Sequence, residues 1–290
     1  DNVALSAKGS YLANNGDITL DAIDGRNLVY GSLEHGAAST LAALPFYYNV
    51  DILKATVIIG DATIRGKDIH IRARAESNPD KDMNNDDGIF NSGSSFLSDL
   101  QSDIEDFKLI AAVSRSDVTS KITISDNAVL EGDNITIEAN SIANVTASPI
   151  SIAVAVAVGV LDTESTVNVN GTLLAAGDIT ISSRTDNYLD VNAEPIFGKS
   201  GYAGSIAVGV LNSDSGVYVN HGSSIVAGGD LSVKAANVDY SYVYAASSAG
   251  NKGKLAVSIA AHVEEGDTEA VLAGDVLVQG DTDVHAVHKQ

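Results

Sequence analysis

The stretch Ala176-Gly177-Asp178-Ile179-Thr180-Ile181 contains a pattern that returns along the chain, a Gly-Asp turn followed by alternating apolar and polar residues. Similar copies begin at Gly16, Gly66, Gly132 and Gly229, and a weaker copy begins at Gly280. The first apolar residues after these turns are separated by 51, 66, 44, 52 and 53 residues. Repetition at about fifty residues predicts a stacked architecture, in which each unit buries its apolar face against its neighbours.

Each repeat contains three strand signals, such as Thr166–Val169, Leu173–Ala175 and Ile179–Ile181. Alternation of apolar residues with Thr, Ser, Asn or His predicts strands with one buried and one solvated face. Three short strands per circuit, with about 22 to 26 residues per circuit and two circuits per repeat, are typical of a parallel β-helix. We therefore predict an all-β chain that forms a single parallel β-helix, or solenoid, over residues 1–290.

The composition agrees with this class and excludes several others. Apolar residues make up 44% of the chain and charged residues 19%, which excludes a disordered chain, and 26 Gly suit many tight turns. The absence of Cys removes disulfides and Cys-based metal sites. The net charge of −21 disfavours nucleic acid and anionic membranes as partners. The longest apolar stretch, Ile150–Leu161, is about half the length of a membrane-spanning helix, so we expect no membrane insertion of this segment.

Three strands are rich in small residues: Ser151–Leu161, Ser205–Leu211 and Leu255–Ala261. In the first of them Ile and Val alternate with Ala and Gly. If Ile and Val fill the core, the opposite face is a flat patch of Ala, Gly and Ser that suits close contact with another surface. Either loops of the same chain or a second molecule would cover such a patch.

Residues 76–107 interrupt the repeat and differ in character from the rest of the chain. Their first half is acidic and rich in turn-forming residues. Their second half, residues 96–107, places apolar side chains at helical spacing and predicts a short amphipathic helix. We therefore expect an inserted polar loop and helix that flank the β-helix.

The acidic loop is the candidate metal site of the sequence. Asp80, Asp82, Asn84 and Asp86 alternate as the oxygen ligands of a calcium ion do in a flexible loop. The motif departs from an EF-hand loop, because Asn85 stands where the tight-turn Gly belongs and Asn91 stands where the bidentate Glu belongs. Calcium is therefore a candidate cofactor, and a solvated loop without metal is the alternative.

The Asp residues of the turns form a second acidic series, which consists of Asp17, Asp68, Asp178 and Asp230. Asp is favoured in turns because its side chain bonds to nearby backbone amides. With two circuits between copies, these side chains would lie about 10 Å apart, too far to share a cation. We therefore assign them a role in the turns.

Catalytic residues do not stand out from the repeat. His70 and His285 occupy the outward position of the Gly-Asp strand that Thr fills in other copies. His285 and His288 are a further candidate pair for a metal, because imidazole is a common ligand. We expect a protein that is not an enzyme. The alternative is a carbohydrate-active β-helix enzyme of the polysaccharide lyase or hydrolase type, which concentrates acids and bases on one sheet.

Tyrosines supply the candidate contact surface. Alignment on the Gly-Asp strands places Tyr240, Tyr242 and Tyr244 over Tyr188, Asp190 and Asn192 of the preceding repeat. A row that changes from small polar residues to three Tyr is a local elaboration, and Tyr offers a flat face and a hydroxyl to a glycan or a protein. We predict a contact surface at these residues. Ordinary cross-strand packing is the alternative.

The repeats as a whole resemble those of very large secreted bacterial exoproteins, the filamentous-haemagglutinin-like and leukotoxin-like adhesins. The resemblance rests on Ala176–Ile181, Ser205–Leu211 and Thr166–Val169, and it covers most of the chain outside the insertion. It implies a right-handed parallel β-helix in the stalk of a secreted or cell-surface bacterial adhesin, and it carries over no catalytic residue.

The expected role of the chain is that of a rigid adhesin spacer whose partners are surface glycans or proteins. A self-assembling filament or matrix protein is a further alternative. Because the chain opens at Asp1 without an initiator Met or signal peptide, we expect it to be a segment of a longer exported protein.

Overall fold

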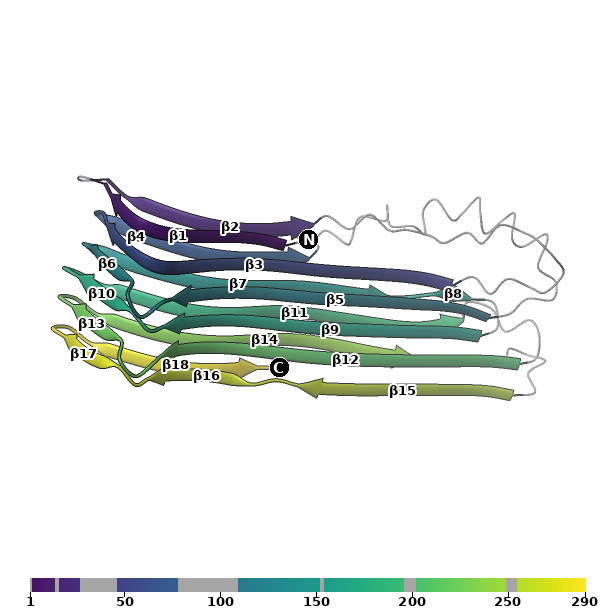
Figure 1. Cartoon of the computed structure of the whole chain (residues 1–290). Helices are drawn as coiled ribbons and strands as arrows, with labels where there is room; N and C mark the ends of the chain where they lie inside the picture. Colours follow the sequence, from purple (N-terminus) through teal and green to yellow (C-terminus); the bar gives the residue numbers. More distant parts are fainter. Residues whose placement is uncertain are drawn as a thin grey trace.

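The computed structural model describes residues 2–13, 16–26, 46–77, 109–151, 154–195, 202–248 and 255–290. All regular elements in these ranges are β-strands, and they form two parallel sheets. Figure 1 shows the sheets as two layers of long strands, with successive repeats stacked on one another. The prediction of an all-β chain built from parallel strands is confirmed.

The larger sheet, sheet A, has the strand order β15-β12-β9-β5-β3-β6-β10-β13-β17, and β1 and β16 pair with β3 and β12. Its longer strands are β1 (Asn2–Leu12), β3 (Phe46–Arg65), β5 (Leu109–Ile124), β9 (Val154–Val169), β12 (Tyr202–Val219), β15 (Leu255–Glu265) and β16 (Thr268–Leu272). Its short strands are β6 (Val129–Gly132), β10 (Thr172–Ala175), β13 (Ser224–Ala227) and β17 (Asp275–Val278). One part of β3 pairs with β5 and the next part pairs with β6, so β6 continues the line of β5 beyond a turn. Each short strand continues the preceding long strand in this way.

The second sheet, sheet B, has the strand order β18-β14-β11-β7-β4-β2, and β8 pairs with β11. Its strands are β2 (Ile18–Arg26), β4 (Asp68–Ser77), β7 (Asn134–Ala147), β8 (Ile150–Ser151), β11 (Ile179–Pro195), β14 (Leu231–Ala245) and β18 (Thr282–Lys289). The Gly-Asp turns lead into its strands β2, β4, β7, β11, β14 and β18. The sequence repeat therefore marks the crossing from sheet A to sheet B.

Each repeat passes once through each sheet, and successive Gly-Asp strands pair directly. Ile135 pairs with Ile179, and Ile179 pairs with Leu231. The predicted steps of 51, 66, 44 and 52 residues are thereby confirmed. The last step is wrong, because Leu231 pairs with Thr282, 51 residues later.

The predicted circuit of about 22 to 26 residues is wrong as well, since one pass through both sheets takes a whole repeat of about fifty residues. The strands predicted to end at Leu161 and to begin at Thr166 are one strand, β9. The polar residues between them continue the alternation of buried and outward-facing positions, so the strand does not break there.

Large aliphatic side chains fill the interior beside the Gly-Asp turns. They come from both sheets and are at most 1% exposed: Ile69, Ile71, Ile122, Ile124, Leu130, Ile135, Ile137 and Leu173. Burying a side chain of this size stabilises a fold by about 1.5–3 kcal/mol. This part of the interior is the principal apolar core.

The small residues of β9 and β12 face inward, so the prediction that they form an outer surface is wrong. Ala155, Ala157 and Leu161 are buried, whereas the alternating Val156, Val158 and Val160 point outward and are half-buried. The reason is the close approach of the two sheets at this end. A Cβ atom added to Gly159 would lie 2.5 Å from Val191 Cγ2, so a larger side chain has no room between the sheets.

The insertion predicted over residues 76–107 falls almost wholly outside the described residues. Glu76 and Ser77 end strand β4. The candidate calcium ligands Asp80, Asp82, Asn84 and Asp86, and the helix expected over residues 96–107, lie outside the described ranges. No helix in the described part of the chain is long and apolar enough to cross a membrane.

Candidate functional site

Four tyrosines form an exposed patch on the outward face of β11 and β14. The register pairs Tyr188 with Tyr240, Asp190 with Tyr242 and Asn192 with Tyr244, as the alignment predicted. The exposed fractions of the four side chains, here called the tyrosine patch, are 38% for Tyr188, 54% for Tyr240, 44% for Tyr242 and 39% for Tyr244. These values place the rings at the surface of a flat sheet.

The tyrosine patch is organised by ring stacking. The ring centroids of Tyr188 and Tyr240 are 4.9 Å apart with an interplanar angle of 5°. Those of Tyr242 and Tyr244 are 6.0 Å apart with an angle of 14°. Stacked pairs of this kind restrict ring rotation and hold the aromatic faces in fixed orientations. The patch is therefore a pre-ordered aromatic surface.

Asp190 adds a carboxylate beside the aromatic rings. Partial burial raises the pKa of Asp190, and a hydrogen bond with Tyr188 acts in the opposite direction. Burial also raises the pKa of Tyr188, and the charge of Asp190 adds to this effect. The patch therefore combines flat apolar rings with hydroxyl and carboxylate groups, which suits a polar, hydroxyl-bearing ligand.

The Asp residues of the turns stack in neighbouring repeats, closer than the predicted 10 Å. The backbone N–H of Asp230 donates to Asp178 Oδ1 at 2.8 Å, and that of Asp281 donates to Asp230 Oδ1 at 2.8 Å. Asn134 takes the equivalent place in its repeat and accepts from Asp178 N at 3.0 Å. The carboxylates therefore bond to the next turn along the stack, which gives them a structural role between repeats.

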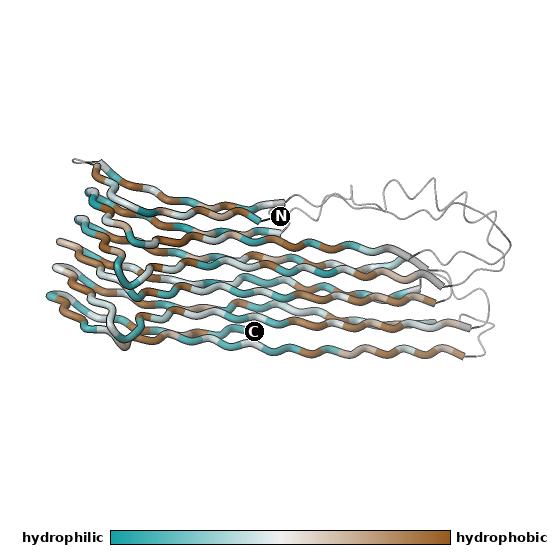
Figure 2. The backbone as a smooth tube through the Cα atoms, viewed as in Figure 1, coloured by the Kyte–Doolittle hydropathy of each residue, from teal (hydrophilic) through white to brown (hydrophobic). Residues whose placement is uncertain are grey.

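Midway along the long strands, the interior is polar. In Figure 2 the middle parts of these strands are mainly hydrophilic and lie between more hydrophobic ends. The polar side chains that point inward here, called the polar band, are at most 5% exposed: Ser120, Ser141, Thr163, Ser165, Ser183, Thr185, Asn187, Ser213, Ser215, Asn237 and Asp239.

Hydrogen bonds in the polar band join the two sheets. Ser165 Oγ of sheet A donates to the carbonyl of Ala139 in sheet B at 2.7 Å. Asn237 Nδ2 of sheet B donates to the carbonyl of Ser213 in sheet A at 2.6 Å, and Asn237 Oδ1 accepts from Thr185 Oγ1 at 2.8 Å. Buried polar groups are stable only when they are paired in this way. The polar band therefore fixes the position of one sheet against the other.

The polar band becomes charged in the last repeat. Asp239 of β14 is buried, and its Oδ2 atom lies 2.8 Å from His288 Nε2 of β18. In the strand register His285 lies opposite Lys234, whose side chain is exposed. The Nε2 atom of His285 lies 2.7 Å from Asp283 Oδ1. Because His285 and His288 are three residues apart on one strand, they point to opposite faces. The two histidines proposed from the sequence as a metal pair therefore do not meet.

Carboxylates also gather in a groove of about 550 Å³ on the outward face of sheet A. Its lining includes Glu164, Asp214, Asp267, Glu269 and Tyr218. Burial raises the pKa of Tyr218, and the neighbouring Glu269 adds to the rise. Sequence inspection missed this cluster because its members belong to separate repeats. Because these residues are spaced by about one repeat, an alignment of the repeats could have revealed the cluster.

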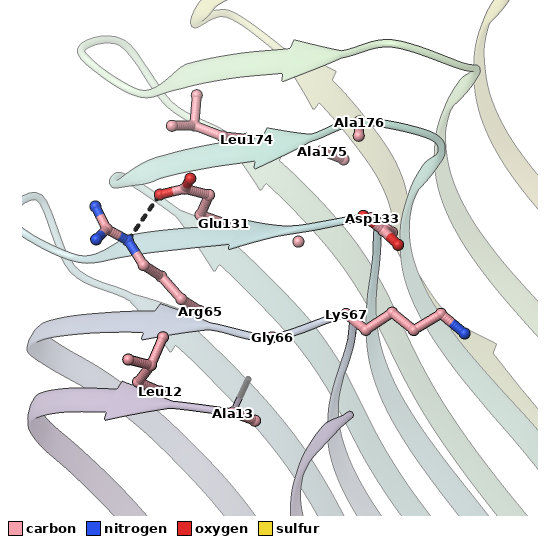
Figure 3. Close-up of a pocket in the computed structure, with 11 residues that line it drawn as sticks. Leu12, Ala13, Arg65, Gly66, Lys67, Glu131, Asp133, Leu174, Ala175 and Ala176 are labelled. Atoms are coloured by element: carbon pink, nitrogen blue, oxygen red, sulfur yellow. Dashed lines mark ion pairs between the residues drawn. The ribbon is translucent and has the colours of Figure 1, made fainter. Parts of the chain in front are cut away.

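A larger groove, of about 930 Å³, follows the turns between the short strands and sheet B (Figure 3). Arg65 Nε and Glu131 Oε2 form an ion pair of 2.7 Å across neighbouring repeats at its edge. Both side chains are exposed, so the pair contributes little to stability. Turn residues such as Gly66 and Ala176 form much of the remaining lining, so the groove follows from the stacking of the turns.

Comparisons of the chain with protein-family models, with curated proteins and with solved structures return no match. The function therefore has to be inferred from the residues of the chain itself.

Proposed function

We propose that this chain is a non-enzymatic segment of a secreted or cell-surface bacterial adhesin, in which a right-handed parallel β-helix acts as a rigid spacer. Two flat parallel sheets joined by regular crossings support the β-helix, and crossings between parallel strands of one sheet are right-handed in about 98% of cases. The net charge of −21 favours a soluble surface that repels anionic membranes and nucleic acids.

The observation that carries the binding role is the tyrosine patch. Its four rings are ordered by stacking before any ligand arrives, so little side-chain entropy is lost on binding. Aromatic faces beside hydroxyl and carboxylate groups are suited to the apolar faces and hydroxyls of a sugar. We therefore propose that the patch contacts a surface glycan.

Replacing Tyr240, Tyr242 and Tyr244 together with serine is expected to reduce glycan binding at least about tenfold without unfolding the chain. All three side chains are 39–54% exposed, so their removal leaves no buried cavity. A glycan array followed by calorimetry on the strongest hit would measure the loss, and the melting temperature of the variant would report on the fold.

The matched control replaces Tyr48, which is 50% exposed on sheet A, with serine. This variant should bind like the wild type. Equal binding by the triple variant and the wild type would contradict the proposal, and so would a large fall in melting temperature, which would assign the Tyr rings to the fold.

Self-association is a second candidate function, favoured by the outward face of sheet A. The outward residues of β12 and β15 include Ile206, Leu255, Val257, Ile259 and Val263, which are 38–57% exposed. The half-buried Val residues of β9 extend this face, called the aliphatic face. The three adjacent strands β9, β12 and β15 present roughly 400 Å² on this face. That area lies within the range of the largest patches on monomers and is about half of the ~800 Å² per partner of a stable interface, so the self-association it supports is weak.

We expect the chain to form a dimer through the aliphatic face, and the double change Ile206→Asp plus Ile259→Asp to make it monomeric. Carboxylates at the centre of an apolar interface would be buried without partners. Sedimentation equilibrium at 0.3–0.5 M NaCl, where the repulsion between two acidic chains is screened, would measure the association. Thr136→Asp plus Thr180→Asp, on the outward face of sheet B, adds the same charge and should leave the dimer intact. A monomeric wild type would exclude this function.

A further inference from the structure

Three potential metal ligands meet at the charged end of the polar band. One ligand atom each of Asp239, Glu264 and His288 lie within 4.8 Å of one another. Glu264 comes from β15 in sheet A, whereas Asp239 and His288 come from β14 and β18 in sheet B. The side chain of Asp239 is fully buried, and those of Glu264 and His288 are 15% and 26% exposed. The cluster therefore bridges the two sheets and keeps an opening to solvent.

In both carboxylates of the cluster, one oxygen accepts a hydrogen bond from a neutral side chain. Asn187 Nδ2 donates to Asp239 Oδ1 at 2.7 Å and Ser241 Oγ donates to Glu264 Oε2 at 3.0 Å. The second oxygens are left for another ligand: Asp239 Oδ2 faces His288, and the buried Glu264 Oε1 has no hydrogen-bond partner among the described residues. Neutral donors that anchor one oxygen of a carboxylate are typical of the second shell of a metal site.

A further buried atom is also unsatisfied. Asn187 is 5% exposed, and its Oδ1 atom has no hydrogen-bond partner within the part of the chain that the structure describes. A buried oxygen without a partner is unfavourable, because it has lost its hydrogen bonds to water without replacement. Asn187 is the residue whose Nδ2 atom holds Asp239 Oδ1, so this unsatisfied atom belongs to a direct neighbour of the cluster. This observation is independent of the acidic character of the cluster.

We propose that Asp239, Glu264 and His288 bind a divalent transition-metal ion of the Zn²⁺ class. Carboxylate oxygen and imidazole nitrogen are both ligands of Zn²⁺, whereas Ca²⁺ and Mg²⁺ select oxygen alone. Three protein ligands leave a fourth position for water. His262, whose Nε2 atom lies 3.6 Å from Glu264 Oε2, adds a second imidazole to the surroundings of the site.

Binding needs only local adjustment of the side chains. Ligands of a tetrahedral Zn²⁺ lie about 3.4 Å apart when each bond is about 2.1 Å long. The Glu264 carboxylate therefore moves inward, and the ion takes the place of the proton between His288 Nε2 and Asp239 Oδ2. His288 then carries its proton on Nδ1. The ion ties sheet A to sheet B in the last repeat, and this role is independent of the tyrosine patch.

Titration of the full chain, freed of metal with a chelator, with ZnCl₂ tests this site by calorimetry. We expect one Zn²⁺ per chain and a rise of several degrees in melting temperature at saturation, because the ion binds only the folded state. His288→Gln and Glu264→Gln should each weaken Zn²⁺ binding at least tenfold and abolish that rise. With Co²⁺ as the probe, the wild type should show visible absorption bands that the variants lack.

The matched control is His285→Gln, which changes a histidine on the same strand but on the opposite, exposed face. It should bind Zn²⁺ as the wild type does, and Ca²⁺ should not compete. Absence of Zn²⁺ binding by the wild type would overturn the proposal. Binding that is lost equally in His285→Gln, or retained in both His288→Gln and Glu264→Gln, would also overturn it.

Discussion

Replacing Gly159 with valine is expected to lower the free energy of unfolding by about 3 kcal/mol. A Cβ atom at this position would lie 2.5 Å from Val191 Cγ2 and 2.8 Å from Leu189 Cδ1. Both contacts belong to β11, which is paired on each side with β7 and β14 and has no freedom to retreat. The added side chain must therefore separate the two sheets, and urea denaturation would measure the cost.

Gly204→Val is the matched control for this change. Gly204 lies on the neighbouring strand β12, and its nearest contact for an added Cβ is Val154 Cγ1 at 3.6 Å. The same valine should change the free energy of unfolding by less than about 0.5 kcal/mol. Equal destabilisation by the two variants would contradict the inward orientation of the small residues in β9.

Asn237→Ala is expected to cost about 3 kcal/mol, because it breaks the polar band at a fully buried position. Asn237 donates to the carbonyl oxygens of Ser213 and Asp267 and accepts from Thr185 Oγ1. Its removal deletes these three hydrogen bonds at a buried site and opens a cavity. The carbonyl of Asp267 still accepts from the Ser215 N–H, and Thr185 Oγ1 keeps its bond with Ser213 Oγ. Thermal and urea denaturation would both report the loss.

Asn212→Ala provides the comparison on the surface. Asn212 Nδ2 also donates to a side chain, Asp162 Oδ1 at 3.2 Å, but at an exposed site where water replaces the lost bond. The expected cost is below about 1 kcal/mol. If the two Asn variants lost the same stability, the polar band would not join the sheets as its hydrogen bonds indicate.

The repeat and most of its register could be predicted from the sequence. The Gly-Asp turn recurs at the same point of each unit, so counting between copies located the strand pairs from Ile18 to Leu231. The final step failed because Thr282, a polar residue, occupies the inward position that Ile or Leu fills elsewhere. Counting from the first apolar residue then displaced the pairing by two positions.

The orientation of the Ala- and Val-rich strands could not be predicted, because alternation defines two faces without stating which is inside. Placing the larger residues in the core would suit sheets packed about 10 Å apart. At Gly159 and Gly209 the sheets are closer, and the side chains of Val191, Leu189 and Val243 fill the space from sheet B alone. The distance between the sheets decides which face of these strands is buried, and a single sequence does not reveal that distance.

The exposed surface site was easier to predict than the buried one. Tyr240 and its neighbours stood out because the aligned residues of other repeats are small and polar. His288 was proposed as a metal ligand with the wrong partner, His285. Asp239 and Glu264 were missed, since a polar residue in a strand was assigned to the solvated face. Asp239 and His288 are 49 residues apart, close to one repeat, and this spacing was the available signal.

The direct pairing of whole repeats determines how the chain responds to a pulling force. Backbone hydrogen bonds between repeats run along the stacking axis, so tension applied through the two ends loads the bonds of one repeat at a time. The repeats therefore detach from the stack one after another. Each peeled repeat releases about fifty residues, or about 170 Å of extended chain. Folded into the stack, the same repeat occupies only about 4.8 Å of its length. Each repeat can therefore lengthen about thirty-five-fold when it leaves the stack.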